Sequence, residues 1–324
     1  HPAMKQSRLL QLVATTCFCV LLPTWVNAGS KDDLSQSFVL GTATQGGGFE
    51  LYGRNLAEVI TLTDPAVTVK AIPTRGSREN LKLLESGKID IGLVEGNAAR
   101  LALEGIGRSK ADLKVLAVMY PNPGMFVVRA DSSYQAIEDL LGKPVAFGTK
   151  SSGLRILARD VLDGIGLSPE TDFEQIILEK AKQGPEMVLG GTADALWGAG
   201  IGWPGFVKVA NSDPGGRFIA PSEQQIHQVL AKHPHLKRMS VPAGTYKGQA
   251  NTIHSVGLWS LVLVRPDLDE SRVYQLVKAL NQGEEALSRR LAKARFSTLK
   301  NTIQVVPGKK LHAGVLKYLE EVGL

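Results

Sequence analysis

Residues 38–60 combine three features that together restrict how the chain can fold. An apolar run of strand length, residues 38–40, leads into a turn rich in Gly and Thr, and apolar residues then recur at helical spacing up to Ile60. The stretch therefore predicts a strand, a glycine loop and a helix. Because the first N–H groups of a helix lack partners within it and the helix dipole adds positive charge, this loop is suited to hold an anionic or carbonyl group. An ordinary tight connection is the alternative, and this stretch alone leaves both open.

The same succession continues directly afterwards. Strands are predicted at residues 67–72, where β-branched residues alternate with other residues, and at residues 89–94. Between them lies a predicted helix through residues 79–85, which Ser77 is placed to cap. A strand, a loop and a helix that repeat in this way are typical of a mostly parallel sheet flanked by helices.

A second region of the chain repeats this organisation. A strand at residues 144–147 runs into a loop of Gly and Ser, residues 148–153, and then into a predicted helix at residues 154–165. Two strand-loop-helix units with similar loops in separate parts of one chain predict an α/β protein of two similar lobes. The hydrophobic share of 44% and the 34 glycines agree with such a fold, because its many strand-to-helix turns use glycine.

Two segments share an ending that is typical of strands crossing between lobes. Residues 126–131 read FVVRAD and residues 262–267 read VLVRPD. We predict that both belong to crossing strands, with a turn at residues 121–124 before the first. The tail, helical at residues 271–291 and 313–319, would then return to the first lobe. The predicted division is lobe I, residues 35–126 and 266–324, and lobe II, residues 127–265.

The first 28 residues have the layout of a secretory signal peptide. Lys5 and Arg8 precede an apolar run at residues 9–22, and Val26-Asn27-Ala28 provides a cleavage sequence. The run is shorter than the roughly 20 residues of a membrane anchor, so we expect export to the periplasm. Both cysteines lie in this segment, and the exported chain would therefore have no disulfide, thiolate nucleophile or cysteine-bound metal.

Charge and motif patterns argue against several other functions. The 37 Lys and Arg residues are dispersed among 31 Asp and Glu residues, which does not resemble a nucleic-acid footprint. Residues 148–153 begin like a phosphate-binding P-loop, but Leu154-Arg155 replaces the required Lys-Ser/Thr. No G-x-S-x-G sequence is present for a serine hydrolase. We expect neither an enzyme nor a cofactor.

Two further motif matches lack the sequence context that their functions need. Residues 200–205 fit the dinucleotide pattern G-x-G-x-x-G, yet Pro204 and the following residues 206–209 favour a strand where a helix is needed. His233-Pro234-His235 has no obvious third metal ligand nearby in the sequence, and a proline between the two suits a surface turn. We therefore expect neither a nucleotide nor a metal.

Four stretches together resemble the TAXI family of TRAP transporter solute-binding proteins. They begin at Gly41 (GTATQGGGFELYG), Thr74 (TRGSRENLKLLESGKIDIGLVEGN), Val127 (VVRADSSYQAIEDLLGKPVAFGTKSSG) and Gly190 (GGTADALWGAGIGWPG). The order and spacing of the four stretches together make the resemblance specific, and it covers essentially the whole exported chain. The resemblance implies a periplasmic-binding-protein fold (type II) whose two lobes close on a small carboxylate or amino acid, such as a glutamate-like compound or a 2-oxo acid.

The resemblance also implies partners and site residues. The loaded receptor would dock on the membrane permease subunits of the transporter, without spanning the membrane itself. A periplasmic sensing module that signals to a membrane histidine kinase is the alternative that the sequence leaves open. The residues expected to bind the ligand are Thr44, Gly46, Gly47, Phe49, Ser77, Glu95, Ser151, Ser152, Gly153, Arg155 and Trp197.

Some of these residues have a second interpretation. Ser151 and Ser152 contact the ligand or only cap a helix. Arg155 stands where the family has Glu, and it either pairs with a ligand carboxylate or faces solvent. Glu95 replaces the more usual Gln, which would favour an ammonium or hydroxyl partner. Trp197 and Trp203 belong to the core or wall the pocket, and of the two Trp197 is the candidate for the pocket.

Overall fold

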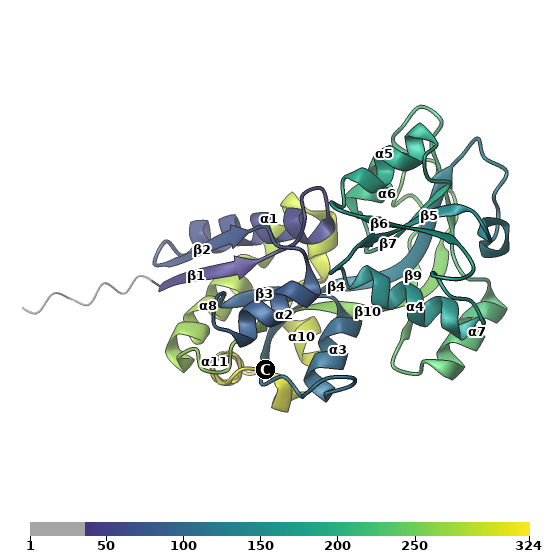
Figure 1. The fold of residues 1–324 in the computed structure, drawn as a ribbon. Coiled ribbons are helices and arrows are strands. Elements are labelled where there is room, and N and C mark those ends of the chain that lie inside the picture. Colours follow the sequence, from purple (N-terminus) through teal and green to yellow (C-terminus); the bar gives the residue numbers. More distant parts are fainter. Residues whose placement is uncertain (1–35) are drawn as a thin grey trace, which may run out of the picture. The chain divides into compact units, whose positions relative to one another are not determined.

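The strands of the protein join into a single mixed sheet. The computed structural model describes residues 36–324, and its ten strands follow the order β2-β1-β3-β10-β4-β7-β5-β6, with β8 beside β4 and β9 beside β10 (Figure 1). The strand bounds are β1 Gln36–Gly41, β2 Val67–Ile72, β3 Ile91–Val94, β4 Lys114–Arg129, β5 Pro144–Thr149, β6 Glu174–Leu178, β7 Ala195–Ala199, β8 Gly216–Ile219, β9 Lys237–Val241 and β10 Ile253–Val264.

Helices cover the strands from both sides. In the half of the sheet around β5, β6 and β7, helices α5 and α6 lie on one side and α4 and α7 on the other (Figure 1). The helix bounds are α1 Gly48–Thr63, α2 Ser77–Glu85, α3 Gly96–Glu104, α4 Leu154–Gly164, α5 Gln183–Gly190, α6 Pro204–Ala210, α7 Glu223–Lys232, α8 Glu270–Gln282, α9 Glu284–Arg290, α10 Leu299–Val305 and α11 Ala313–Glu321, with short 3-10 helices η1 Ile137–Leu140, η2 Ala292–Phe296 and η3 Gly308–Lys310.

The sheet has two parallel parts connected by antiparallel strands. β1 pairs in parallel with β2 and β3, and β5 pairs in parallel with β6 and β7. Between these parts, β10 runs antiparallel to both β3 and β4, and β4 runs antiparallel to β7. This mixed sheet with flanking helices confirms the predicted α/β fold class.

The buried side chains gather in two regions. One core draws on residues 38–120 and 262–319 together with Ile156 of α4, whereas two adjoining clusters draw on residues 125–256. We call the parts of the chain around these cores the first lobe and the second lobe. The cores change over within β4 and within β10, so these two strands run through both lobes. The division at residues 126/127 and 265/266 stays a prediction.

The predicted turn at residues 121–124 is wrong. β4 continues through these residues, and Pro121, Asn122 and Pro123 lie opposite Trp259, Leu258 and Gly257 of β10. A register shift between Trp259 and Leu261 accommodates the prolines, which lack the N–H that a regular ladder uses. The partner strand therefore overrides the local turn signal.

Residues 206–209 are helical, which corrects a second expectation. They belong to α6, and Pro204 occupies its first turn, where proline needs no N–H partner. Phe206 and Val209 are fully buried, so tertiary packing outweighs the strand preference of Val207 and Val209. The structure gives another argument against a dinucleotide site. A side-chain carbon at Gly205 would lie 2.5 Å from the Trp203 ring, so this ring occupies the space beside the glycine.

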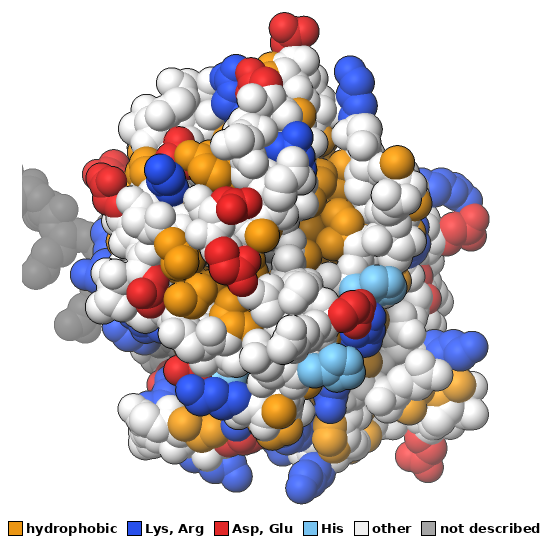
Figure 2. All heavy atoms as spheres, turned by 90° about the vertical axis from the view of Figure 1, so that its right-hand side faces the viewer, with side chains coloured by type: hydrophobic (Ala, Val, Ile, Leu, Met, Phe, Trp, Pro, Cys, Tyr) orange, Lys and Arg blue, Asp and Glu red, His pale blue; other side chains and the backbone are white. Residues whose placement is uncertain are grey.

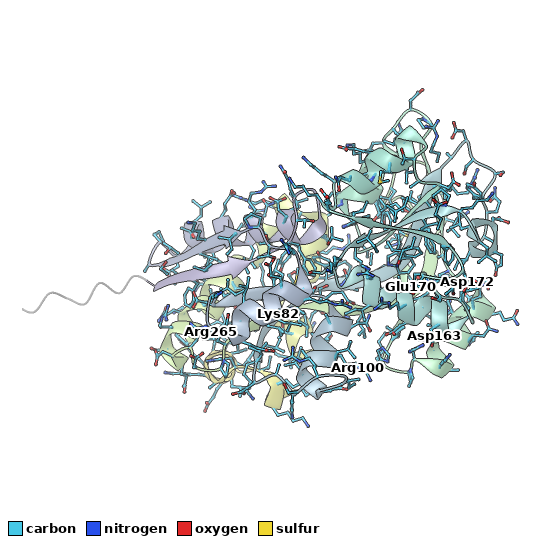
Figure 3. The ribbon with its side chains drawn as sticks, viewed as in Figure 1. Lys82, Arg100, Asp163, Glu170, Asp172 and Arg265 are labelled. Carbon is cyan, nitrogen blue, oxygen red and sulfur yellow. The ribbon has the colours of Figure 1, made fainter. Side chains whose placement is uncertain are left out.

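The surface carries both signs of charge. On the face shown in Figure 2, Lys and Arg side chains are interspersed with Asp and Glu side chains. Arg265, which follows β10 in the first lobe (Figure 3), forms an ion pair of 2.7 Å with Asp90 just before β3. No helix between residues 36 and 324 is long and apolar enough to cross a membrane. The predicted signal peptide, residues 1–28, lies outside the described residues.

The crossing strands make their closest approach at Gly257, which generates a prediction. A side-chain carbon at Gly257 would lie 1.8 Å from the backbone oxygen of Asn122, so β10 would have to move away from β4. We expect Gly257→Ala to lower the free energy of unfolding by about 3 kcal/mol or more. Urea unfolding measures this change. Gly190→Ala is the control, because Gly190 has open space around it, and should change stability by less than about 1 kcal/mol. Equal stability of the two variants would contradict the assignment.

Candidate ligand-binding site

A cavity of about 60 Å³ lies where the two lobes meet. An ordered water needs roughly 10–15 Å³ by this measure, so the cavity has room for a small solute. The first lobe contributes the loop before α1, the starts of α2 and α3, and β4, while the second lobe contributes the loop between β5 and α4 and the start of α6. The lining residues are Ala43, Thr44, Gly47, Gly48, Phe49, Gly76, Ser77, Glu95, Tyr120, Asn122, Gly148, Thr149, Ser152, Gly153, Leu154, Leu178, Ala181, Ala199, Trp203 and Ser260.

The two lobes touch each other directly beside this cavity. The N–H of Arg78 donates to the carbonyl oxygen of Ser151 at 3.2 Å, and the N–H of Ala181 donates to Thr44 Oγ1 at 3.1 Å. Gly153 fits so closely against the Glu95 side chain that an added carbon would lie 2.2 Å from Glu95 Cβ. These contacts hold the two lobes together around the cavity.

The start of α1 forms one wall of the cavity. Gly47 is the N-terminal cap residue, and no side chain accepts a hydrogen bond from the first turn there. Gly46 just before it has a φ of +82°, a left-handed conformation that suits glycine. The exposed N–H groups and the dipole of this 16-residue helix both favour a negative charge in the cavity.

Lys293 places a buried amino group behind the same wall, without lining the cavity itself. The residue, in η2, is 3% exposed, and its ammonium lies 3.4 Å from the Tyr120 hydroxyl and 4.4 Å from the centre of the Tyr120 ring. A side-chain carbon at Gly48 would lie 3.0 Å from Lys293 Nζ, which places the ammonium directly behind the start of α1. Within residues 36–324, Lys293 forms no ion pair with a carboxylate. Burial lowers the pKa of Lys293 to about 7.

Glu95 is the buried acid of the site. Its carboxylate caps α3, where it accepts hydrogen bonds from the N–H groups of Asn97 and Ala98 at 2.9 and 3.2 Å. Its own N–H donates to Ser77 Oγ at 2.9 Å. Burial raises the pKa of Glu95 to about 7, and the negative charge of Asp160 adds to this, whereas the hydrogen bonds from Asn97 and Ala98 act in the opposite direction. A carboxyl with a pKa near 7 can donate a hydrogen bond to a ligand when it is protonated and accept one when it is ionised.

The base of the cavity comes from the crossing strands. The Asn122 amide donates to Ser260 Oγ and, at 3.2 Å, to the carbonyl oxygen of Leu258, which fixes it between β4 and β10. Trp203 covers the second-lobe side and packs edge to face on Phe206, with ring centres 4.9 Å apart. Polar groups at the base and an aromatic ring at the side are the usual composition of a small-solute pocket.

The family model described as the NMT1-like family matches residues 40–323. This chain belongs to the NMT1-like family. The NMT1-like protein also shares its fold with solved structures of low sequence identity. The periplasmic binding protein BugD matches with a TM-score of 0.57 and 13% identity, over 89% of this chain and 98% of that one. The alkanesulfonate-binding protein SsuA from Xanthomonas axonopodis pv. citri, solved with bound MOPS, matches with a TM-score of 0.51 and 20% identity, over 88% and 83% of the two chains. These likenesses confirm a periplasmic-binding-protein fold.

Seven of the residues expected to bind ligand line the cavity of this NMT1-like protein. They come from three loops of the first lobe and one of the second: Thr44, Gly47, Phe49, Ser77, Glu95, Ser152 and Gly153. Gly76 is the N-cap residue of α2 and Ser77 is the first residue of the helix, so the predicted capping role of Ser77 is wrong. The Ser77 hydroxyl instead accepts a hydrogen bond from the N–H of Glu95. The ligand contacts themselves stay predictions.

The other four expected residues do not line the cavity. Gly46 packs against Lys182, and Ser151 uses its carbonyl to hold Arg78. Arg155 is half-buried, and its Nη1 donates to the carbonyl oxygen of Lys150 at 3.0 Å. Trp197 is fully buried in the second-lobe core and donates its indole N–H to Leu154 at 2.9 Å. The structure therefore exchanges the expected roles of Trp197 and Trp203.

Sequence reasoning missed several important lining or adjacent groups of the NMT1-like protein. Lys293 stands among Arg289, Arg290 and Arg295, and in the sequence this run looks like an exposed helix face. Asn122 lies between two prolines, which suggested a turn. Neither position carries a local signal for a pocket, because packing between distant segments brings Asn122 to the cavity and Lys293 behind its wall.

The acidity of Glu95 generates a prediction. In the folded protein its pKa is raised from the ordinary 4.5 to about 7, so its ionisation costs stability as pH rises from about 4.5 to 7, and the full cost is present above pH 7. Glu95→Gln keeps an oxygen for the cap but cannot ionise, and it should gain roughly 3 kcal/mol over the parent between pH 4.5 and 8. Urea unfolding of both proteins at the two pH values measures the difference. The exposed Glu186→Gln serves as control, and a Glu95→Gln gain that is independent of pH would contradict the assignment.

Proposed function

We propose that this NMT1-like protein is the periplasmic solute receptor of a TRAP-type transporter of the TAXI family. It binds a small carboxylate or amino acid between its lobes and delivers it to the membrane permease subunits, without catalysing a reaction. Support comes from the periplasmic-binding-protein fold, from the sequence stretches that resemble the TAXI family, and from the cavity enclosed by both lobes. The N-terminal sequence pattern supports export to the periplasm.

The buried ammonium of Lys293 behind the start of α1 is the observation that carries this proposal. A buried charge without an opposite partner is costly, and here the cost is visible in the pKa of Lys293, which burial lowers to about 7. A ligand carboxylate at the cavity wall would receive N–H groups from α1 and gain a counter-ion in Lys293. The site therefore favours an anion over a neutral or cationic solute.

Glu95 suggests the second half of the ligand. Its carboxyl contributes to the same cavity from the start of α3. An ionised Glu95 would pair with the ammonium of an amino acid, whereas a protonated Glu95 would donate to the keto oxygen of a 2-oxo acid. Both ligand types place one carboxylate toward Lys293, and they differ in what they offer to Glu95. Comparing the two classes of ligand in one assay therefore decides between them.

A binding screen tests the proposed function. The protein should first be unfolded and refolded to remove any ligand acquired during expression. Glutamate-like amino acids, 2-oxo acids, dicarboxylates and small sulfonates are then added, with the uncharged amide of each hit as its control. A true ligand at 100 times its Kd should add about 2.7 kcal/mol to the free energy of unfolding, which thermal unfolding detects. If no organic anion stabilises the refolded protein, the proposal is overturned.

Replacing Lys293 tests the anion contact directly. Lys293→Met removes the buried cation, so the affinity for an anionic ligand should fall about 10- to 100-fold, while the ligand-free protein should keep or gain stability at pH 7. In the parent protein at pH 8, anion binding should raise the pKa of Lys293 and draw a proton from solution. Calorimetry in two buffers of different ionisation enthalpy measures this proton uptake.

The exposed Lys300→Met is the matched control, because it removes one positive charge from the neighbouring α10. It should leave affinity and proton uptake unchanged. Equal losses in both variants would point to a general charge effect, and an unchanged affinity in Lys293→Met would remove Lys293 from the site.

A further inference from the structure

Two histidines and an aspartate gather where α4 meets the segment after α7. Asp160 is in α4, and His233 and His235 follow α7 directly. Asp160 Oδ1 lies 3.9 Å from His233 Nδ1, and Asp160 Oδ2 lies 3.0 Å from His235 Nε2. One possible ligand atom from each residue lies within 4.8 Å of those of the other two. The three side chains are only partly covered, with exposed fractions of 16–24%, so an ion could reach them from solvent.

This spacing suits a tetrahedral metal ion. Nitrogen and oxygen ligands lie about 2.0–2.2 Å from zinc, which puts neighbouring ligand atoms of a tetrahedron roughly 3.3 Å apart. The two separations from Asp160, 3.0 and 3.9 Å, lie on either side of this value, and the ligand atoms of all three residues lie within 4.8 Å of one another, so rotations of the side chains would complete the geometry. Two imidazoles and one carboxylate are a set that binds divalent zinc and similar transition metals.

A second carboxylate orients one of the histidines. His233 Nε2 lies 2.7 Å from Asp163 Oδ2, so in a metal complex this nitrogen would donate to Asp163 and Nδ1, on the side of Asp160, would bind the ion. Metal-binding histidines usually have such a carboxylate on the other ring nitrogen. Asp163 lies one turn further along α4 than Asp160, so both carboxylates lie on the same face of that helix.

We propose that Asp160, His233 and His235 form a binding site for a divalent transition metal such as Zn²⁺. The sequence offered no third ligand for the two histidines, because Asp160 is 75 residues away from His235 and only folding brings them together. The site is separate from the solute cavity and does not depend on the proposed transport function.

The site also lies against the first lobe. Asn97, at the start of α3, has its side-chain oxygen 3.2 Å from His235 Nε2. A metal held by the three second-lobe residues would therefore have Asn97 of the first lobe beside it. Figure 3 shows Arg100 on α3 of the first lobe and Asp163 on α4 of the second lobe. A groove beside these helices is lined by Asn97, Arg100, Asp160, Lys232, His233 and His235, among others. Its two cations are already paired, Arg100 with Glu104 at 3.4 Å and Lys232 with Asp163 at 3.0 Å, so they leave the ligand set available.

Metal binding by the tag-free exported chain tests this proposal. After dialysis against a chelator, titration calorimetry with Zn²⁺ should give one ion per chain, and Co²⁺ should give the visible absorption of a four-coordinate site. Asp160→Asn and His235→Ala should each weaken Zn²⁺ binding at least 100-fold. Asp163→Asn leaves all three ligands in place and should weaken it about 10- to 100-fold. His227→Ala removes an exposed histidine of α7 and should change nothing.

The outcomes separate a built site from surface binding. Absence of a stoichiometric ion in the parent protein, or equal affinity in the parent and Asp160→Asn, would overturn the proposal. Near-ultraviolet circular dichroism of each variant verifies that it is folded before the titration. Because the titration contains no solute, a negative solute screen would leave its result unaffected.

Discussion

The antiparallel pairing of β4 with β10 is the constraint on which the remaining structure depends. Each strand contributes buried residues to both cores, and the two run side by side from Lys114 opposite Val264 to Pro123 opposite Gly257. Between these ends, Asn122 and Ser260 form the base of the cavity. The lobes are therefore joined by two paired strands, and a change in the angle between the lobes would have to be taken up where these strands cross. The close fit at Gly257 leaves no room for a side chain between the two strands.

The two buried ionisable groups at the cavity, Lys293 and Glu95, form no ion pair with each other. Lys293 approaches from the C-terminal segment behind α1, and Glu95 approaches from the start of α3. Burial disfavours the charged form of both, so each titrates near neutral pH in the absence of a partner. A small solute with a carboxylate at one end would relieve the cost at Lys293. Under the proposed function, the burial of these charges destabilises the protein when no anion is bound, and a suitable anion relieves that cost. Such a difference is what selectivity for an anion requires.

The two tryptophans show why sequence reasoning places residues in the correct region but not always on the correct side. Trp197 is in β7, and alternation along the strand directs it into the core against Phe126. Trp203 lies beyond the end of that strand, in the loop before α6, and loops at strand ends are where pockets form. The glycine-rich surroundings are common to both residues, so the distinction needed the exact end of β7. Strand ends are the least certain feature of any sequence prediction.

The sequence by itself determined the α/β class, the repeated strand-loop-helix units and the loops that carry Thr44, Gly47, Glu95 and Ser152, because periodicity, glycines and capping residues are local signals. Only the tertiary structure decided that Lys293 lies behind α1, that Asn122 belongs to a continuous strand, and that Asp160 meets His233 and His235. Each of these depends on contact between segments far apart in the chain. A lysine or an aspartate has no local pattern that tells whether it is solvated or buried, since that is settled by the segments that pack over it.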